Sequence, residues 1–170
     1  MKSKKNLVFL GMMGSGKSSI GLLVAKKLQL NFKDIDNEIE KELGKKITDI
    51  FKENGEDFFR KIEEKITLKQ LKLNSSVISL GGGAFTNRNI RKEVLKNHLS
   101  FWLNWNNKIL LKRIKNSQKR PLAINSSDNE IIDLIQKRSI IYAKALFEIK
   151  CDNLSKNEVV NKVIKIYEAD

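Results

Sequence analysis

Cysteine, histidine and proline are almost absent from this chain of 170 residues, in which each occurs once, as Cys151, His98 and Pro121. A single cysteine excludes a disulfide within the chain and fits a reducing compartment such as the cytoplasm. One histidine and one cysteine cannot complete a zinc site. We therefore expect any metal to be magnesium, held by oxygen ligands.

Long hydrophobic runs are also missing. No apolar stretch approaches the roughly 18 residues that span a bilayer, and the apolar run after the basic N-terminus is too short for a signal peptide. We therefore expect a cytoplasmic protein with no membrane partner. The length and the hydrophobic content of 41% fit one domain with its own core. Nothing in the sequence indicates a large exposed apolar patch, so a monomer is expected.

Acidic residues are outnumbered, with 20 Asp and Glu against 33 Lys and Arg, and the net charge is +13. Such a charge can serve nucleic-acid binding. The lysines, however, are spread along the whole chain, and its few aromatic residues are not interleaved with a basic block as in a single-strand binder. We therefore favour scattered surface lysines, some of which help to attract anionic substrates, over a nucleic-acid partner.

Glycine is concentrated in a motif near the N-terminus. Residues 11–18 read Gly-Met-Met-Gly-Ser-Gly-Lys-Ser and match the phosphate-binding loop pattern G-x-x-x-x-G-K-[ST]. Its glycines let the backbone bring N–H groups close to phosphate oxygens. Lys17 can reach the β- and γ-phosphates, and the Ser18 hydroxyl can bind magnesium. An apolar run precedes the loop and a helical pattern follows it, as the motif requires. It predicts nucleotide binding, but not what is done with the nucleotide.

Strand-like and helical patterns alternate along the chain. This alternation predicts an α/β fold of three layers, a five-stranded parallel sheet with helices on both faces. We expect strands at 5–10, 31–35, 76–80, 99–104 and 147–151. We expect helices at 17–29, 36–44, 48–54, 56–72, 88–97, 106–115, 129–146 and 156–168, with Thr48 and Asp128 as N-caps. The segment 116–127 holds the proline and several turn-forming residues, so a mobile lid is expected there.

Two carboxylates stand at the expected end of the second strand, where open α/β sheets bind ligands. Asp34 and Asp36 flank Ile35, whereas the third strand runs into glycines and offers no aspartate. A phosphoryl-transferring enzyme with this loop needs an acid near magnesium. One aspartate can serve the metal, directly or through water, and the other can accept a proton from a substrate hydroxyl. The alternative is a pair of surface acids that begin a helix.

Two arginines are candidates for binding an anionic substrate. Arg138 falls within the apolar stripe of the helix 129–146, where a lone cation is costly unless it meets an anion. That anion is either a substrate carboxylate held bidentately or an internal acidic partner. Arg60 has Glu63 and Glu64 three and four residues further on, which can orient its guanidinium. The same spacing fits an ordinary surface ion pair, and the spacing alone favours the ion pair.

Three further features are compatible with ligand binding. Gly81-Gly82-Gly83 follow the third strand and either let the backbone approach a ligand or form a plain turn. Arg120, in the expected lid, can stabilise charge at the γ-phosphate or be a solvated loop cation. Arg113, where the preceding helix leads into the lid, can stack on an adenine ring.

As a set, these motifs resemble the shikimate kinase family, from the nucleoside-monophosphate-kinase-like branch of phosphate-loop proteins. The resemblance covers essentially the whole chain. Its most specific features are Asp34-Ile35-Asp36, Phe59-Arg60 with Glu63, Gly81-Gly82-Gly83 and Arg120-Pro121-Leu122. It implies a single kinase domain over 1–170, with an acceptor-binding region at about 34–62 and a lid at about 116–127.

The resemblance also implies a reaction, in which ATP with Mg²⁺ phosphorylates the 3-hydroxyl of shikimate in aromatic amino acid biosynthesis. It implies nucleotide binding by Gly14, Ser15, Gly16, Lys17, Ser18, Ser19, Arg113 and Arg120. It implies shikimate binding by Asp36, Arg60, Gly82, Gly83 and Arg138, with both arginines on the carboxylate. Magnesium falls to Ser18 and Asp34, and catalysis to Lys17, Asp36 and Arg120.

The chain departs from the family pattern in two places. Ala123 stands where the family often has leucine, which softens lid packing without removing the chemistry. The loop 152–155 lacks a proline often found near the adenine, so the adenine contacts there stay open.

Two other functions also stay open. A different small-molecule kinase, such as gluconate kinase, would share the phosphate loop but not the paired arginines with three glycines. A non-catalytic nucleotide-binding module would not need Asp36, Arg60 and Arg138 together.

Overall fold

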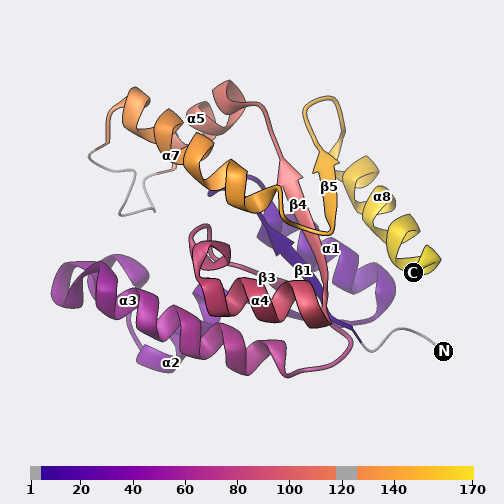
Figure 1. Cartoon of the computed structure of the whole chain (residues 1–170), viewed down its shortest axis with the longest axis horizontal. Coiled ribbons are helices and arrows are strands. Elements are labelled where there is room, and N and C mark those ends of the chain that lie inside the picture. Colours follow the sequence, from indigo (N-terminus) through magenta and orange to yellow (C-terminus); the bar gives the residue numbers. More distant parts are fainter. Residues whose placement is uncertain (1–4, 118–125) are drawn as a thin grey trace.

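The centre of the fold is a parallel sheet with the strand order β2-β3-β1-β4-β5 (Figure 1). The computed structural model describes residues 5–117 and 126–170. The five strands are β1 (Leu7–Leu10), β2 (Asn31–Asp34), β3 (Ser76–Ser79), β4 (Leu99–Asn104) and β5 (Phe147–Lys150). Every strand pair is parallel. The predicted sheet is confirmed, although most strands are one or two residues shorter than expected.

Helices cover both faces of this sheet (Figure 1). One face carries α1 (Lys17–Leu28) and α8 (Lys156–Ala169). The other carries α2 (Ile35–Leu43), α3 (Ile47–Leu71), α4 (Arg88–Asn97), α5 (Asn107–Lys115) and α7 (Asp128–Tyr142). A short 3₁₀ turn, η1 (Ala84–Thr86), follows β3 and was not expected from the sequence.

The two faces bury separate cores, because successive side chains of a strand point to opposite sides. In β1, Leu7 and Phe9 pack with α1 and α8, whereas Val8 and Leu10 pack with the helices of the other face. All four side chains are almost completely buried. A strand covered on both faces reads as a continuous apolar run, which explains the sequence of β1.

The start of α3 differs from the prediction. Its N-cap is Lys46, not Thr48, and Lys46 makes no side-chain cap bond. Instead, a carboxylate oxygen of Glu40 in α2 accepts a hydrogen bond from the Ile47 amide at 3.0 Å. The predicted helices 48–54 and 56–72 form one element that kinks at Gly55, where φ is 81° and ψ is 174°.

The start and the end of α7 also differ. Ser127, not Asp128, is the N-cap, and it forms a capping box with Glu130. Aspartate is a good N-cap, but here it occupies the first helical turn, where its negative charge faces the helix dipole favourably. The helix ends at Tyr142 rather than at 146, so that the chain can turn into β5.

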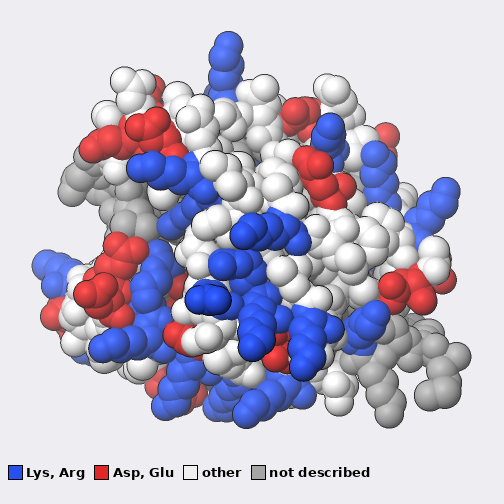
Figure 2. All heavy atoms as spheres, viewed as in Figure 1, with Lys and Arg blue, Asp and Glu red and all other residues white. Residues whose placement is uncertain are grey.

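Positive charge is spread over the surface. On the face shown in Figure 2, lysine and arginine side chains lie over most of the molecule, with acidic side chains interspersed. No helix in the described ranges is long and apolar enough to cross a membrane. Most of the predicted lid, residues 118–125, lies outside the described residues.

Candidate active site

The residues singled out from the sequence gather at the carboxyl edge of the sheet. The loop 11–16 follows β1, Asp34 ends β2, and the three glycines 81–83 follow β3. Trp105 directly follows β4 on the same edge. Because all the strands are parallel, segments far apart in the sequence meet here, as ligand sites in open α/β sheets do.

The loop has the backbone that its glycines predict. Gly11, Gly14 and Gly16 have φ values of 141°, 79° and 87°, a region that side chains disfavour. Gly16 is the N-cap of α1, so the positive end of this helix faces the loop. The side chain of Lys17 lies back across the loop, with its Nζ 2.9 Å from the carbonyl oxygens of both Gly11 and Met12.

The predicted metal pair is adjacent. The Ser18 hydroxyl donates a hydrogen bond to the Asp34 carboxylate, which also accepts from the Asp36 amide as the N-cap of α2. A cavity of about 230 Å³ opens beside them, lined by Gly14, Gly16, Lys17, Ser18, Ser19, Asp34, Asp36 and Leu80. In the described part of the chain, no three His, Cys, Asp or Glu side chains cluster as a metal site. Magnesium bound with a nucleotide needs fewer protein ligands, because phosphates and waters complete its shell.

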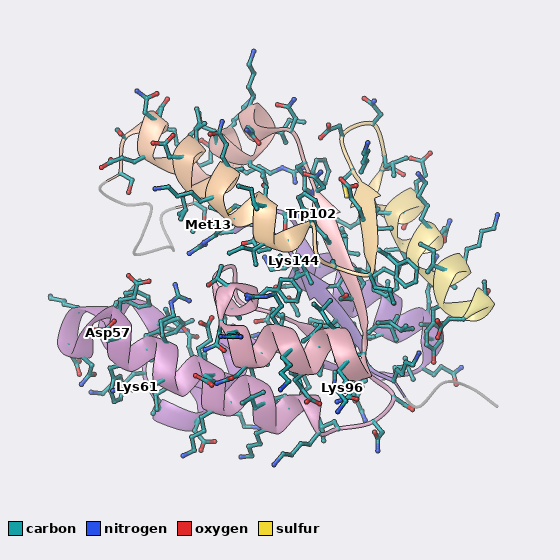
Figure 3. All side chains as sticks on the ribbon, viewed as in Figure 1. Met13, Asp57, Lys61, Lys96, Trp102 and Lys144 are labelled. Atoms are coloured by element: carbon teal, nitrogen blue, oxygen red, sulfur yellow. The ribbon has the colours of Figure 1, made fainter. Side chains whose placement is uncertain are left out.

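A second cavity brings together the five predicted acceptor-binding residues. It is lined by Met13, Asp36, Ile47, Phe51, Phe59, Arg60, Glu63, Gly82, Gly83 and Arg138. Met13, from the phosphate loop, lies between α7 and α3 in the view of Figure 3. We call this second cavity the acceptor cavity, and the cavity beside Ser18 and Asp34 the phosphate-side cavity. Asp36 lines both of them. The two aspartates are therefore not merely surface acids at a helix start.

Arg60 is held by two carboxylates of its own helix. Its Nη1 lies 2.7 Å from Glu63 Oε2, and its Nη2 lies 3.1 Å from Glu56 Oε1. The Glu63 side chain is only 3% exposed. Burial raises the pKa of the Glu63 carboxyl, while the charge of Arg60 and its hydrogen bond act in the opposite direction. The ion pair is therefore partly buried at the cavity, unlike the exposed pairs that contribute little.

Arg138 is buried on α7, with 7% of its surface exposed. Its Nη1 lies 3.9 Å from the sulfur of Met12, and its charge acts on Glu63, which faces the same cavity. Glu63 and a carboxylate bound in this cavity can both compensate the buried cation. One turn further along α7, the Tyr142 hydroxyl donates to the carbonyl oxygen of Gly82.

Gly81 and Gly83, which follow β3, lie close to the ends of two side chains of the acceptor cavity. A methyl group on Gly83 would lie 2.7 Å from Cζ of Arg60, and one on Gly81 would lie 2.5 Å from Oε1 of Glu63. Both distances are shorter than a van der Waals contact allows. The structure therefore favours close approach over the plain flexible turn.

A third cavity, of about 370 Å³, lies on the other side of the phosphate loop. It is lined by Gly14, Ser15, Gly16, Ser19, Ile20, Trp105, Arg113, Leu154, Lys156 and Val159. Arg113, predicted to stack on adenine, lines it, and Leu154 brings in the loop 152–155. The predicted nucleotide-binding residues from Gly14 to Ser19 line this cavity or the phosphate-side cavity. Arg120, like Pro121, Leu122 and Ala123, lies outside the described residues.

Sequence reasoning assigned no binding role to the apolar lining of these cavities, although Phe59 was part of the family motif. Phe51 and Phe59, whose ring centroids are 4.6 Å apart, stand on either side of the kink at Gly55. Trp105 was missed although it directly follows a predicted strand, a position that is itself a signal for ligand contact. The bond from the Tyr142 hydroxyl to Gly82 was also missed, because it joins segments 60 residues apart.

Known proteins resemble this chain over nearly its whole length. The family model described as shikimate kinase matches residues 13–168. A shikimate kinase of Persephonella marina is 39% identical over 160 residues, which is 94% of this chain and 97% of the relative. One of Bacillus subtilis is 40% identical over 172 residues, covering 95% and 88%.

Solved structures agree. A shikimate kinase from Acinetobacter baumannii in complex with shikimate has a TM-score of 0.92 at 26% identity, covering 99% of this chain and 95% of that one. Shikimate kinase from Aquifex aeolicus has a TM-score of 0.85 at 32% identity, covering 96% of each chain. A gluconokinase from Sinorhizobium meliloti, with a TM-score of 0.60 at 17% identity, shares the fold. This chain belongs to the shikimate kinase family.

Proposed function

We propose that this protein transfers the γ-phosphoryl group of ATP to the 3-hydroxyl of shikimate, giving shikimate 3-phosphate and ADP. The observation that carries the proposal is the position of Asp36, in the walls of both the phosphate-side cavity and the acceptor cavity. A hydroxyl bound beside Asp36 faces the end of a bound triphosphate. Arg60 and Arg138 in the same acceptor cavity supply a site for the shikimate carboxylate.

In this proposal, Asp36 binds the reacting hydroxyl and accepts its proton as the oxygen–phosphorus bond forms. The bond between the γ-phosphorus and the bridging oxygen breaks, and ADP leaves with that electron pair. Lys17 moves from the carbonyl oxygens of Gly11 and Met12 to the phosphates. Its charge then stabilises the transition state, since phosphoryl transfer depends on positioning and electrostatics.

We propose Ser18 and Asp34 as the magnesium-binding residues. Their adjacent hydroxyl and carboxylate oxygens are the ligand types that Mg²⁺ takes alongside phosphate, with Asp34 acting through a water. When bound, Mg²⁺ neutralises developing charge on the phosphate oxygens. Arg113 is proposed to stack on the adenine, as its position in the third cavity supports. The role of Arg120 at the γ-phosphate is proposed from the sequence alone.

We further propose that the chain is one kinase domain, with an acceptor-binding region at about 34–62 and a lid at about 116–127. It acts as a monomer in the cytoplasm, without nucleic-acid or membrane partners. The lone, buried Cys151 supports the cytoplasmic part of this proposal, because it fits a reducing compartment. Light scattering of the purified protein tests the monomer.

A coupled assay of ADP release, run with shikimate and with gluconate as acceptors, tests the proposed reaction. We expect turnover with shikimate and only background release with gluconate. Lys17→Met is the control for the phosphate loop, and its turnover should fall to background. Folded protein that releases no ADP with shikimate, or that prefers gluconate, would contradict the proposal.

A further inference from the structure

Trp105 stands between the phosphate loop and the third cavity. It follows the last residue of β4, Asn104, and is partly exposed to the cavity that Arg113 also lines. Its ring packs against the edges of both hydrophobic cores. A tryptophan with this packing alone would be a structural residue. Two further contacts, however, join it to the phosphate loop and to Arg113.

The first contact joins the indole to the phosphate loop. Its Nε1 donates to the carbonyl oxygen of Ser15 at 2.9 Å. Buried indole N–H groups seek such a partner, and this one fixes the ring plane relative to the loop. The indole is therefore held against the loop that is expected to bind the phosphates.

The second contact is with Arg113. Its Cζ lies 3.9 Å from the centroid of the Trp105 ring, well within the range of a cation–π interaction. Nη1 of the same guanidinium lies 3.2 Å from the carbonyl oxygen of Gly14. One planar guanidinium is thus fixed at its face by an indole and at its edge by the backbone of the loop. The carbonyl groups that accept from the two side chains belong to consecutive residues.

We propose that Trp105 is a positioning residue for the nucleotide base. It holds Arg113 flat, so that the guanidinium presents its other face to the adenine ring. The result is a three-layer stack of indole, guanidinium and base, in which the two protein layers are anchored to Gly14 and Ser15. A mobile arginine would have to be ordered when the nucleotide binds, at a cost in side-chain entropy, and Trp105 removes part of that cost. The inference rests on the proposal that ATP binds with its base in this cavity.

Calorimetric titration with ADP and Mg²⁺, without shikimate, tests this role. Trp105→Leu removes both contacts and should weaken ADP binding about tenfold, whereas Trp105→Phe keeps a ring and should weaken it about threefold. Binding of shikimate alone should change less than twofold in both variants. A merely structural role would instead lower both affinities together, and that result would overturn the proposal.

A double-mutant cycle isolates the action through Arg113. In an Arg113→Ala background, Trp105→Leu should cause little further loss of ADP affinity, since the layer that it supports is gone. Fully additive losses would overturn the proposal. If Trp105→Leu does not fold, Trp105→Phe serves in the same cycle.

Intrinsic fluorescence gives a second readout, because the chain has two tryptophans. Trp102 does not line the third cavity and packs near Tyr142, with ring centroids 6.1 Å apart. ADP should change the emission of Trp102→Phe, whose only tryptophan is Trp105, and leave that of Trp105→Phe nearly constant. A response that follows Trp102 instead would contradict the three-layer stack. These readouts need no phosphoryl transfer, so a protein that binds ADP but does not act on shikimate would contradict only the proposed function.

Discussion

At the scale of single residues, charge is concentrated at the acceptor cavity. Two arginines, Arg60 and Arg138, and two acids, Asp36 and Glu63, line it together. Glu63 is the most enclosed of the acids, and the charges of the other three residues all act on it. Its ionised form orients Arg60, so the state of Glu63 decides how well Arg60 can meet a carboxylate.

If shikimate binds at the proposed acceptor cavity, Glu63 should make its binding sensitive to acid. Burial raises its pKa, so it takes up a proton at a higher pH than an ordinary glutamate, and protonation weakens the pair with Arg60. We expect the KM for shikimate to rise as the pH falls, and to begin rising at a higher pH than an ordinary glutamate would give. Glu63→Gln should have a high KM with a flatter dependence on pH. Steady-state kinetics at several pH values measure this. Glu64→Gln, which alters a carboxylate bonded to Asn87 and Asn89, is the matched control. If the KM of Glu63→Gln for shikimate rose with acid as steeply as that of the native protein, this role of Glu63 would be contradicted.

The Tyr142 hydroxyl connects α7 to the glycine segment 81–83, which lines the acceptor cavity. It is 1% exposed, and burial raises its pKa to about 12, so the hydroxyl remains a donor to Gly82 at neutral pH. Tyr142→Phe should raise the KM for shikimate about threefold to tenfold, the usual value of one hydrogen bond, with little change in the KM for ATP. Tyr167→Phe is the control, since the buried Tyr167 hydroxyl has no hydrogen-bond partner among the described residues. Equal effects of both variants would argue against positioning by Tyr142.

The sequence predicted the individual polar residues of the site better than their partners. Asp36 and Arg138 could be chosen because a charge beside a motif, or on an apolar stripe, has a local signature, whereas Arg60 was chosen through the family resemblance. The bonds from Tyr142 to Gly82 and from Trp105 to Ser15 have none, because each joins segments far apart in the chain. Such contacts depend on strand order, which hydrophobic periodicity alone does not reveal.

At the scale of elements, the ends of helices depend on the side chains just outside them. The Ser155 hydroxyl accepts from the Glu158 amide, and Glu158 Oε2 accepts from the Ser155 amide at 2.7 Å, at the start of α8. The first residue of this helix, Lys156, lines the third cavity together with Leu154. The cap therefore fixes one wall of the proposed base site.

Ser155→Ala should lower the free energy of unfolding by about 1 kcal/mol, because it leaves a helix N–H without its partner. It should also weaken ADP binding slightly, since the cavity wall frays. Denaturant unfolding measures the first effect. Ser127→Ala removes the equivalent cap of α7 and should cost a similar amount of stability. A stability loss below about 0.3 kcal/mol in both variants would contradict the importance of the two caps.

Element positions were predictable because apolar runs and helical spacings alternate along this chain, but element ends were less so. The start of α3 depends on Glu40, which belongs to the preceding helix, and no local rule identifies such a cap. The turn η1 follows three glycines and is too short to have a period. The break at Gly55 was predictable, since a positive φ favours glycine.

At the scale of the whole molecule, the parallel sheet creates the two-substrate arrangement. The loop after β1 lies centrally, with the segments after β3 and β2 on one side and those after β4 and β5 on the other. The acceptor cavity and the proposed base cavity therefore flank the phosphate loop. Strand order places the acceptor cavity and the proposed base cavity on opposite sides of the phosphate loop, and Asp36 lines both the acceptor cavity and the phosphate-side cavity.

The central claim is that Asp36 joins these two sides, so that phosphate passes from ATP to the acceptor hydroxyl. Phosphorus NMR of a mixture of protein, ATP, Mg²⁺ and shikimate tests it most directly. We predict a new phosphate monoester signal on shikimate that grows as ADP appears, and a rate at least a hundredfold lower for Asp36→Asn, in line with the usual size of general base catalysis, about 10²–10⁴. ADP formed with free inorganic phosphate in place of the monoester, or an Asp36→Asn variant as fast as the native protein, would contradict the account.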